Sequence, residues 1–395
     1  MCSERIFTLG FFIISAVNFL VILVFYILFV IIGVYASDIF GSGLNEAGLV
    51  AGIFIIGVLV GRLVMGGVIE SLGQRSSLLL SVGFFCVATA LYFLEYTSDF
   101  LIIVRFIHGF ALGLAATAIS TVAALVIPVS RKAEGISYFS LSFALASAIG
   151  PFIGFLIVGE WLYVNIFILC FMLSVFAFFM CFFMPGSLFV SGASGKAKNK
   201  PINGRFFESK AFPISFIALL IGVCYSSVLA FLNAYAKDVE LLGAASLFFM
   251  VYSVVVLVSR PFSGRLLDQR GAGLVMYPCF LFFSAGLFVL GAASEGWMIL
   301  LAAALIGLGF GNMQSSTQAI AVKSVNVSRI GAATSTFFVF FDAGMGFGPF
   351  LLGFIIPVLG YRGLFFTVGG LAVFCALIYF LQCRGNLYQT SLPCR

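Results

Sequence analysis

Charged side chains are scarce in this sequence: Asp, Glu, Lys and Arg make up 9% of 395 residues, whereas hydrophobic residues make up 63%. A water-soluble core of this size could not be so poor in charge, so most of the chain must be surrounded by lipid. Histidine occurs once, and the nine cysteines, an odd number, lie mostly in apolar runs without metal-ligand spacing. We therefore expect no metal and no cofactor, and cysteines that pack as small apolar residues.

Catalytic motifs are missing as well. The sequence has no nucleophile–base pair, no metal cluster and no nucleotide-binding loop, so we expect neither an enzyme nor an ATP-driven pump. The net charge of +6 would suit a nucleic-acid partner, but the positions of the basic residues explain it differently, as shown below.

Twelve apolar runs follow one another, each close to or above the ~20 residues that cross the hydrocarbon of a bilayer. They cover residues 7–35, 46–69, 76–96, 100–127, 135–158, 161–184, 212–236, 244–267, 273–293, 297–322, 330–357 and 361–382. The first run is too long for a signal-peptide core and has no small-residue cleavage site, so we count it as a span. The sequence thus predicts an all-α membrane protein with twelve transmembrane helices.

Gly, Ser, Asn and Lys dominate residues 186–211, which indicates a flexible linker. We expect a six-helix bundle on each side of it, formed by residues 1–185 and 212–395. An even number of spans places both termini on one side, and most basic residues, including those of the linker, fall on that side. The positive-inside rule makes that side cytoplasmic. The basic excess is therefore a topology signal, and we expect no nucleic-acid partner.

One charged turn occurs twice in the chain. In each copy a glycine is followed four residues later by a carboxylate and seven residues later by another glycine. These residues are Gly66, Glu70 and Gly73, with Arg75 shortly after, and, 198 positions further on, Gly264, Asp268 and Gly271. An arginine precedes each copy by four residues, and the offset is about half of the chain. We infer an internal duplication in which this turn marks equivalent points of the two halves.

The same offset relates Gly150-Pro151 in the fifth span to Gly348-Pro349 in the eleventh. A glycine–proline pair bends a helix and frees a carbonyl group, which would let two bundles rock against each other. An ordinary kink at a small-residue packing site explains the pair equally well.

The repeated turn resembles the loop signature of the major facilitator superfamily, G-x-x-x-D-R-x-G-R-R. The sequence departs from it in using Glu70, and in placing Ser71 and Gln269 where the signature has arginine. Arg105 and Gly109 resemble the R-x-x-x-G signature on the fourth span of proton-coupled members. Together with the duplication, the resemblance covers the whole chain and implies two six-helix bundles with a substrate site between them.

Gly150, Pro151 and Gly154 also resemble part of the antiporter signature G-x8-G-x3-G-P-x-x-G-G, although its other glycine positions hold Ser137, Ala146 and Phe155. The stretch from Arg105 to Tyr138 is similar to drug and metallophore exporters of the superfamily. This implies a proton-coupled exporter.

Asp342 is the deepest carboxylate, about 13 residues or roughly 20 Å of helix after Arg329. An isolated carboxylate there should be neutral at rest and is a candidate proton carrier; a structural hydrogen bond to another helix is the alternative. Arg105 lies inside the fourth span, where it either takes part in proton coupling or anion attraction, or snorkels to the headgroups. His108, one turn later, is either a titrating partner or a hydrogen-bonded packing residue.

Polar side chains gather in spans 1, 4, 7 and 10, which line the central cavity in the superfamily. We expect a substrate cavity that includes Asn18, Tyr26, Thr117, Tyr225, Asn312, Gln314 and Gln318.

These observations favour a monomeric, proton-coupled exporter of a small organic solute in the cytoplasmic (inner) membrane of a bacterium. A proton symporter or facilitator for a sugar, organic acid or other metabolite is the main alternative, and a receptor on the same scaffold is less favoured. We further expect the repeated turns to act as a gate of the transport path, with Glu70 capping the start of the eleventh span near residues 328–331 when the cytoplasmic side is closed.

Overall fold

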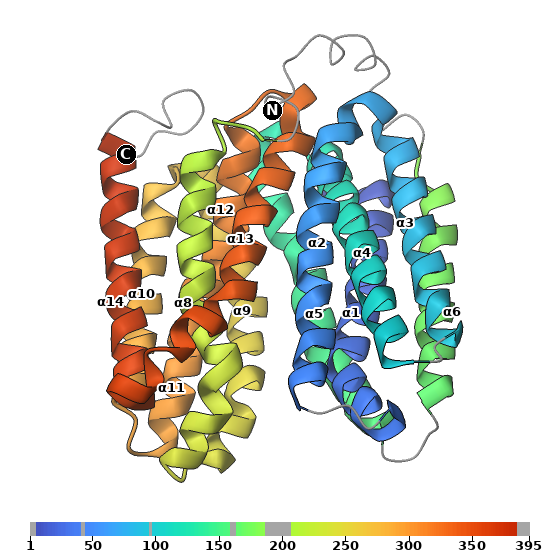
Figure 1. Ribbon diagram of the computed structural model, residues 1–395. Helices are drawn as coiled ribbons and strands as arrows, with labels where there is room; N and C mark the ends of the chain where they lie inside the picture. The colour runs from blue at the N-terminus through green and yellow to red at the C-terminus, as the bar shows by residue number, and fades with distance from the viewer. Residues whose placement is uncertain (1–4, 41–43, 95–96, 159–162, 186–206, 385–395) are drawn as a thin grey trace. The chain divides into compact units, whose positions relative to one another are not determined.

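The computed structural model describes residues 5–40, 44–94, 97–158, 163–185 and 207–384, and every regular element within these ranges is a helix (Figure 1). The first half of the chain forms α1 (Leu9–Phe40), α2 (Leu44–Leu72), α3 (Gln74–Ala90), α4 (Ser98–Val126), α5 (Lys132–Val158) and α6 (Tyr163–Phe182). The second half forms α8 (Phe212–Asp238), α9 (Leu242–Arg270), α10 (Gly273–Gly291), α11 (Gly296–Ile306), α12 (Asn312–Lys323), α13 (Ile330–Gly353) and α14 (Ile356–Arg384).

Within the described residues, eleven segments are long and apolar enough to cross a membrane. One of them, Gly296–Lys323, joins α11 and α12 through a π-helical turn at Gly307–Gly311. The helix α5 has 27 residues and occupies the place of the remaining expected span, but some of its side chains lie outside the described part. The all-helical fold is confirmed, and the number of twelve spans stays a prediction.

Glycines with positive φ end helices at both copies of the repeated turn. Gly73 follows α2 with φ 81°, and Gly271 follows α9 with φ 90°. Side chains with a Cβ rarely adopt this backbone conformation, so the second glycine of each copy is needed for the chain to turn sharply. Gly360, with φ 68°, bends the chain inside α14 directly before the predicted span 361–382.

Residue contacts divide the chain into two compact units, which we call unit 1 and unit 2. Unit 1 consists of Met1–Pro128, Ser142–Glu208 and Asn326–Thr336, and unit 2 consists of Val129–Leu141, Ser209–Val325 and Phe337–Arg395. The start of α5 therefore packs with helices of the second half, and the start of α13 packs with helices of the first half. The boundaries 1–185, 186–211 and 212–395 stay predictions, and residues 186–206 of the linker lie outside the described part.

Unit 1 is held together by very close packing of α2 on α4, two helices that lie side by side in Figure 1. Gly57 and Gly61 on α2 face Gly109 and Gly113 on α4. A Cβ added at any of the four would overlap a backbone carbonyl oxygen of the other helix. Small residues four apart allow such backbone contact in a membrane, where packing rather than hydrophobic burial drives helix association.

In unit 2, α10 packs on α11 and α14, and α8 packs on α14. The hydroxyl of Tyr235 in α8 donates a hydrogen bond of 2.8 Å to the carbonyl oxygen of Leu290 in α10. Gly344 of α13 lies against the backbone of Leu219 in α8, so these two helices also approach closely. This crossing places the middle of α13, which carries Asp342, beside α8.

Candidate functional site

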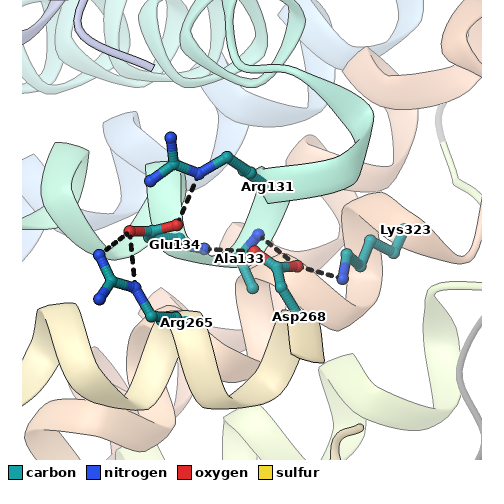
Figure 2. Close-up of polar contacts among 6 residues, drawn as sticks. All are labelled: Arg131, Ala133, Glu134, Arg265, Asp268 and Lys323. Atoms are coloured by element: carbon teal, nitrogen blue, oxygen red, sulfur yellow. Dashed lines mark hydrogen bonds and ion pairs between the residues drawn. The ribbon is translucent and has the colours of Figure 1, made fainter. Parts of the chain in front are cut away.

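In unit 2, the carboxylate of Asp268 near the end of α9 caps the start of α5 (Figure 2). Its Oδ1 accepts a hydrogen bond from the backbone N–H of Ala133 at 3.1 Å, and its Oδ2 accepts one from Glu134 at 2.8 Å. The first N–H groups of a helix have no partner inside the helix and carry partial positive charge, so a carboxylate stabilises them. Lys323, the last residue of α12, also pairs with Asp268 Oδ1.

Glu134 forms a second ionic centre in the same cluster. Its Oε2 lies 2.8 Å from Arg131 Nε, and its Oε1 lies 3.1 Å from Arg265 Nη2, as Figure 2 shows. The side chain of Glu134 is only 4% exposed, whereas that of Arg265 is 54% exposed. The hydrogen bond to Glu134 raises the pKa of Arg131. We call the residues Arg131, Ala133, Glu134, Arg265, Asp268 and Lys323 the α5-start cluster.

The first glycine of the repeat explains why α5 can approach α9. A Cβ at Gly264 would lie 2.8 Å from the carbonyl oxygen of Ala133 and would also overlap the hydroxyl of Ser137. Any side chain at this position would push the start of α5 away from α9 and separate Asp268 from the amides that it caps.

The equivalent cluster in unit 1 joins the end of α2 to the start of α13. Both carboxylate oxygens of Glu70 lie 3.2 Å from Arg329 Nη1, and Arg329 Nε lies 2.7 Å from an oxygen of Glu208. The hydroxyl of Ser335 donates a hydrogen bond of 2.7 Å to the carbonyl of Arg62. We call Glu70, Glu208 and Arg329 the α13-start cluster.

The contact of Glu70 falls within the segment that the sequence indicates, residues 328–331, and it is made with the side chain of Arg329. In the second copy, the shorter Asp268 binds backbone amides instead. Each copy thus places a carboxylate at a helix start: Glu70 pairs with Arg329, and Asp268 caps α5 and pairs with Lys323. Arg75 is exposed on α3, and no contact with these clusters is found in the described part of the chain.

Arg105 and His108 lie on α4, completely buried inside unit 1. Arg105 Nη1 donates to the hydroxyl of Tyr92 at 3.1 Å, and that hydroxyl is 3.2 Å from His108 Nδ1. His108 Nε2 is 3.3 Å from the hydroxyl of Thr89. The guanidinium carbon of Arg105 lies 4.2 Å above the ring centre of Phe54, a cation–π arrangement. The side chain of Arg105 is thus enclosed within unit 1 and not exposed at its surface.

Asp342 lies in α13 and is partly buried in unit 2. The neighbouring ring of Phe341 stacks with Phe337 and with Phe310 at centroid distances of 6.1 Å. Gly222 of α8 approaches the carbonyl oxygen of Phe341 so closely that an added Cβ would lie 3.0 Å from it. Asp342 therefore directly follows a residue of an aromatic cluster where α13 crosses α8.

The two predicted kink sites occupy equivalent places in the two halves. A Cβ at Gly150 of α5 would overlap Tyr26 of α1, and a Cβ at Gly348 of α13 would overlap Ser226 of α8. Both glycines thus pack against the first helix of their own half. Pro151 and Pro349 lie inside helices that continue to Val158 and Gly353, so neither proline ends its helix.

The predicted cavity residues fall into two groups, one in each unit. In unit 1, Asn18 donates a hydrogen bond of 2.8 Å to Ser142, Thr117 bonds to the backbone of its own helix, and Tyr26 packs on α5. In unit 2, Asn312 donates to Ser259 at 2.9 Å, and the ring of Tyr225 stacks on Phe310 at 3.7 Å. Gln314 accepts a hydrogen bond from Arg260, and Gln318 is buried on α12.

Arg260 is a buried polar centre that the sequence marked only as part of the repeat. Its side chain is 1% exposed and donates to the carbonyl oxygens of Gly311 and Ser140 at 2.9 and 2.6 Å, and to Gln314 at 2.8 Å. Arg260 thereby joins α9, the start of α5 and the π-helical turn at Gly307–Gly311. Turns of this kind often occur at functional sites. Its position four residues before Gly264 was the available signal.

The fold and these sites define a class of protein: a multi-pass helical membrane protein built from two related halves, with buried charges and polar side chains inside its spans. Comparison with known proteins gives the family. The family model described as Major Facilitator Superfamily matches residues 14–341 and, in a second match, residues 242–386. The chain belongs to the Major Facilitator Superfamily, and it is a membrane transporter.

Several known transporters are similar to this chain, and their names indicate different roles. An uncharacterized MFS-type transporter of Methanocaldococcus jannaschii is 24% identical over 89% of this chain and 92% of its own length. The multidrug resistance protein MdtG of Salmonella arizonae is 26% identical, but the match covers only 44% of each protein. Among solved structures, the human organic anion transporter MFSD10 aligns with a TM-score of 0.75 at 13% identity over 93% of this chain and 98% of its own. The proton:xylose symporter XylE aligns with a TM-score of 0.73 at 16% identity over 94% and 95%. These two likenesses show the fold alone.

Proposed function

We propose that the protein is a proton-coupled exporter of a small organic solute, either a drug-like compound or a metallophore, that works by alternating access. The position of Asp342 in the middle of α13, partly buried in unit 2, carries this proposal. A carboxylate inside a membrane span is costly when charged, so it is usually retained for a function such as binding a proton. The partial match to a multidrug resistance protein supports export of organic compounds.

Asp342 is the proposed proton carrier, and Arg105 with its neighbour His108 forms the second coupling site. Asp342 crosses the membrane region while neutral and releases its proton when it becomes accessible to the other side. Arg105 is fixed and permanently charged, which suits it to favour proton release from a carboxylate that comes near it or to attract an anionic part of the solute.

The two start clusters are the proposed gates. Asp268 and Glu70 each hold the start of a helix, α5 or α13, whose remaining length belongs to the other unit. Releasing and re-forming these contacts during the cycle requires only a few kcal/mol, because each helix cap or ion pair contributes about 0.3–2 kcal/mol. The glycine–proline pairs at Gly150 and Gly348 are the proposed points at which α5 and α13 bend. The repeated turns would face the cytoplasm of a bacterium, and the transporter would work as a monomer.

Proton flux in proteoliposomes tests this proposal. Purified protein is reconstituted with a pH-sensitive dye inside the vesicles, and candidate solutes are added from outside. An exporter that exchanges solute for protons moves protons opposite to the solute. A symporter moves both in the same direction, and a facilitator moves the solute alone. Movement of protons with the solute would overturn the exporter proposal in favour of a symporter of the XylE type.

A further inference from the structure

The helices α5 and α9 contact each other at successive levels about one helical turn apart, and Arg260 forms the level farthest from the end of α9. At that end, Asp268 caps the first amides of α5. Four residues earlier, Gly264 lies against Ser137. Four residues earlier again, Arg260 Nη1 donates to the carbonyl oxygen of Ser140 at 2.6 Å. Positions four apart share one face of a helix, so these contacts form a continuous row, which we call the α5–α9 seam.

Arg260 also reaches beyond the seam to the π-helical turn Gly307–Gly311. Its Nε donates a hydrogen bond of 2.9 Å to the carbonyl oxygen of Gly311, the last residue of the turn. Another carbonyl of the turn, that of Leu308, accepts from the side chain of Asn312 at 2.9 Å. A π-helical turn interrupts the regular ladder of helix hydrogen bonds, and backbone groups inside a protein need partners. Side-chain donors therefore help to hold this turn in its irregular form.

The turn places Phe310 among aromatic rings of unit 2. Its ring stacks on Tyr225 of α8 at a centroid distance of 3.7 Å, and it lies 5.7 Å from the ring of Phe283 and 6.1 Å from that of Phe341. Phe341 directly precedes Asp342, the proposed proton carrier. Because packed side chains transmit a displacement to their neighbours, a shift of the turn would change the packing beside Asp342.

The charge of Arg260 makes its contacts depend on one another. The side chain is almost completely buried, and it donates to three neutral acceptors, the carbonyl oxygens of Gly311 and Ser140 and the side-chain oxygen of Gln314. A buried guanidinium that loses an acceptor keeps its charge, so the loss is strongly destabilising. If the start of α5 leaves α9, Ser140 is withdrawn. The guanidinium must then shift, which disturbs its bond to the turn.

We propose that Arg260 is a positioning residue that couples the start of α5 to the π-helical turn. While α5 is docked on α9, the guanidinium holds the turn, and with it Phe310, in the observed form. When α5 undocks, the turn is released. Opening of the α5–α9 seam and the packing beside Asp342 therefore change together. That this coupling serves transport rests on the proposed function, whereas the link between seam and turn does not.

Cysteines can report on both ends of this link. Cys279 of α10 is buried, and its thiol lies 3.7 Å from the carbonyl oxygen of Leu308, so it reports on the turn. Ser137→Cys places a thiol at a buried position of the seam. Buried thiols react with N-ethylmaleimide at a rate set by local opening. Rates are measured without solute on full-length proteins that each keep a single cysteine, and Cys375, buried in α14, is the control for folding.

Three variants test the link. Asp268→Asn loosens the seam, and we expect it to speed the labelling of Cys279 by about fivefold or more, as for two coupled sites. Arg260→Lys keeps the charge but lacks the planar fork that binds several acceptors. We expect it to speed labelling in Ser137→Cys by a similar factor, and to abolish the effect of Asp268→Asn on Cys279. Gln314→Met removes one acceptor and makes the same comparison through a smaller change, in case Arg260→Lys does not fold.

A purely local role of Arg260 predicts a different pattern of labelling. Arg260→Lys would then affect Cys279 alone, and Asp268→Asn would affect Ser137→Cys alone. That pattern, or an effect of Asp268→Asn on Cys279 that persists undiminished in both Arg260→Lys and Gln314→Met, would overturn the proposal. Labelling requires neither solute nor proton movement. Failure of the proposed function, which the proton-flux measurement detects, is therefore distinguishable from failure of this link.

Discussion

Asp268 accepts hydrogen bonds through both of its carboxylate oxygens from the start of α5, and its shorter contact is 2.8 Å to the backbone N–H of Glu134. The two residues are 134 positions apart in the chain. The side chain of Glu134 in turn binds Arg131 and Arg265, so α9 holds the start of α5 through both residues of the pair. Neutralising the carboxylate of either Asp268 or Glu134 should therefore loosen the contact between α9 and the start of α5.

Asp268→Asn should slow transport while leaving solute affinity nearly unchanged. Asn can accept from one amide, but it loses the negative charge that stabilises the helix start and pairs with Lys323. We expect a rate lower by up to about thirtyfold, the factor that corresponds to ~2 kcal/mol. Rates and binding are measured in the same proteoliposomes, and Asp238→Asn, at an exposed carboxylate of α8, is the matched control. Loss of affinity at an unchanged rate would show that Asp268 is no gate residue.

Glu70 and Arg329 should act as a coupled pair. Glu70→Gln, Arg329→Gln and the double variant form a cycle, and we expect a coupling of about 0.5–3 kcal/mol in the transport rate, since the side chains are in contact. Glu208→Gln serves as the comparison, because Glu208 binds the same arginine from the end of the linker. Strictly additive effects of Glu70→Gln and Arg329→Gln would show that the two side chains do not act together in transport.

The repeated turns should both face the cytoplasm. Ser71 and Gln269 are exposed at equivalent positions, so single cysteines at these sites are accessible to a membrane-impermeant thiol reagent. In a background without the native cysteines, we expect labelling in inverted vesicles and none in intact cells. Labelling of either site from outside would break the topology, whatever the solute is.

Gly109→Ala should destabilise unit 1. The added Cβ would overlap the carbonyl oxygen of Phe54, so α2 and α4 must separate, and overpacking of this kind costs about 1–3 kcal/mol. The measurement is thermal unfolding of the purified protein in detergent. The control is Gly52→Ala on α2, the helix that packs against Gly109, because a Cβ at Gly52 would meet nothing within 4 Å. Equal unfolding temperatures for the two variants would mean that the contact is more tolerant than its geometry indicates.

The features that could be predicted from the sequence are those that repeat or continue along the chain. The apolar runs became helices, and Gly73 and Gly271 proved to be the residues with positive φ at the two turns. Contacts that depend on distant parts of the chain could not be predicted. Glu134 has no acidic counterpart 198 positions later, and its partner Arg265 is far away in sequence.

The buried networks show the same limit. Tyr92 is an ordinary aromatic residue within an apolar run, and only the folded helices bring its hydroxyl between Arg105 and His108. The sequence left His108 open between a titrating group and a packing residue, because both uses require the same residue type in the same kind of span. Its contacts with Tyr92 and Thr89 come from folded helices, and no pattern along the chain indicates them.

Asp342→Asn tests the central claim most directly, because Asn resembles the protonated carboxylic acid at nearly unchanged volume. Two modes are measured in the same vesicles: solute accumulation driven by a pH gradient, and exchange of solute down its own gradient. We expect the variant to fold, bind solute and retain exchange, but to lose accumulation, while the control Asp238→Asn retains both. If the Asn variant still concentrates solute against its gradient, Asp342 is not the proton carrier and the account is contradicted.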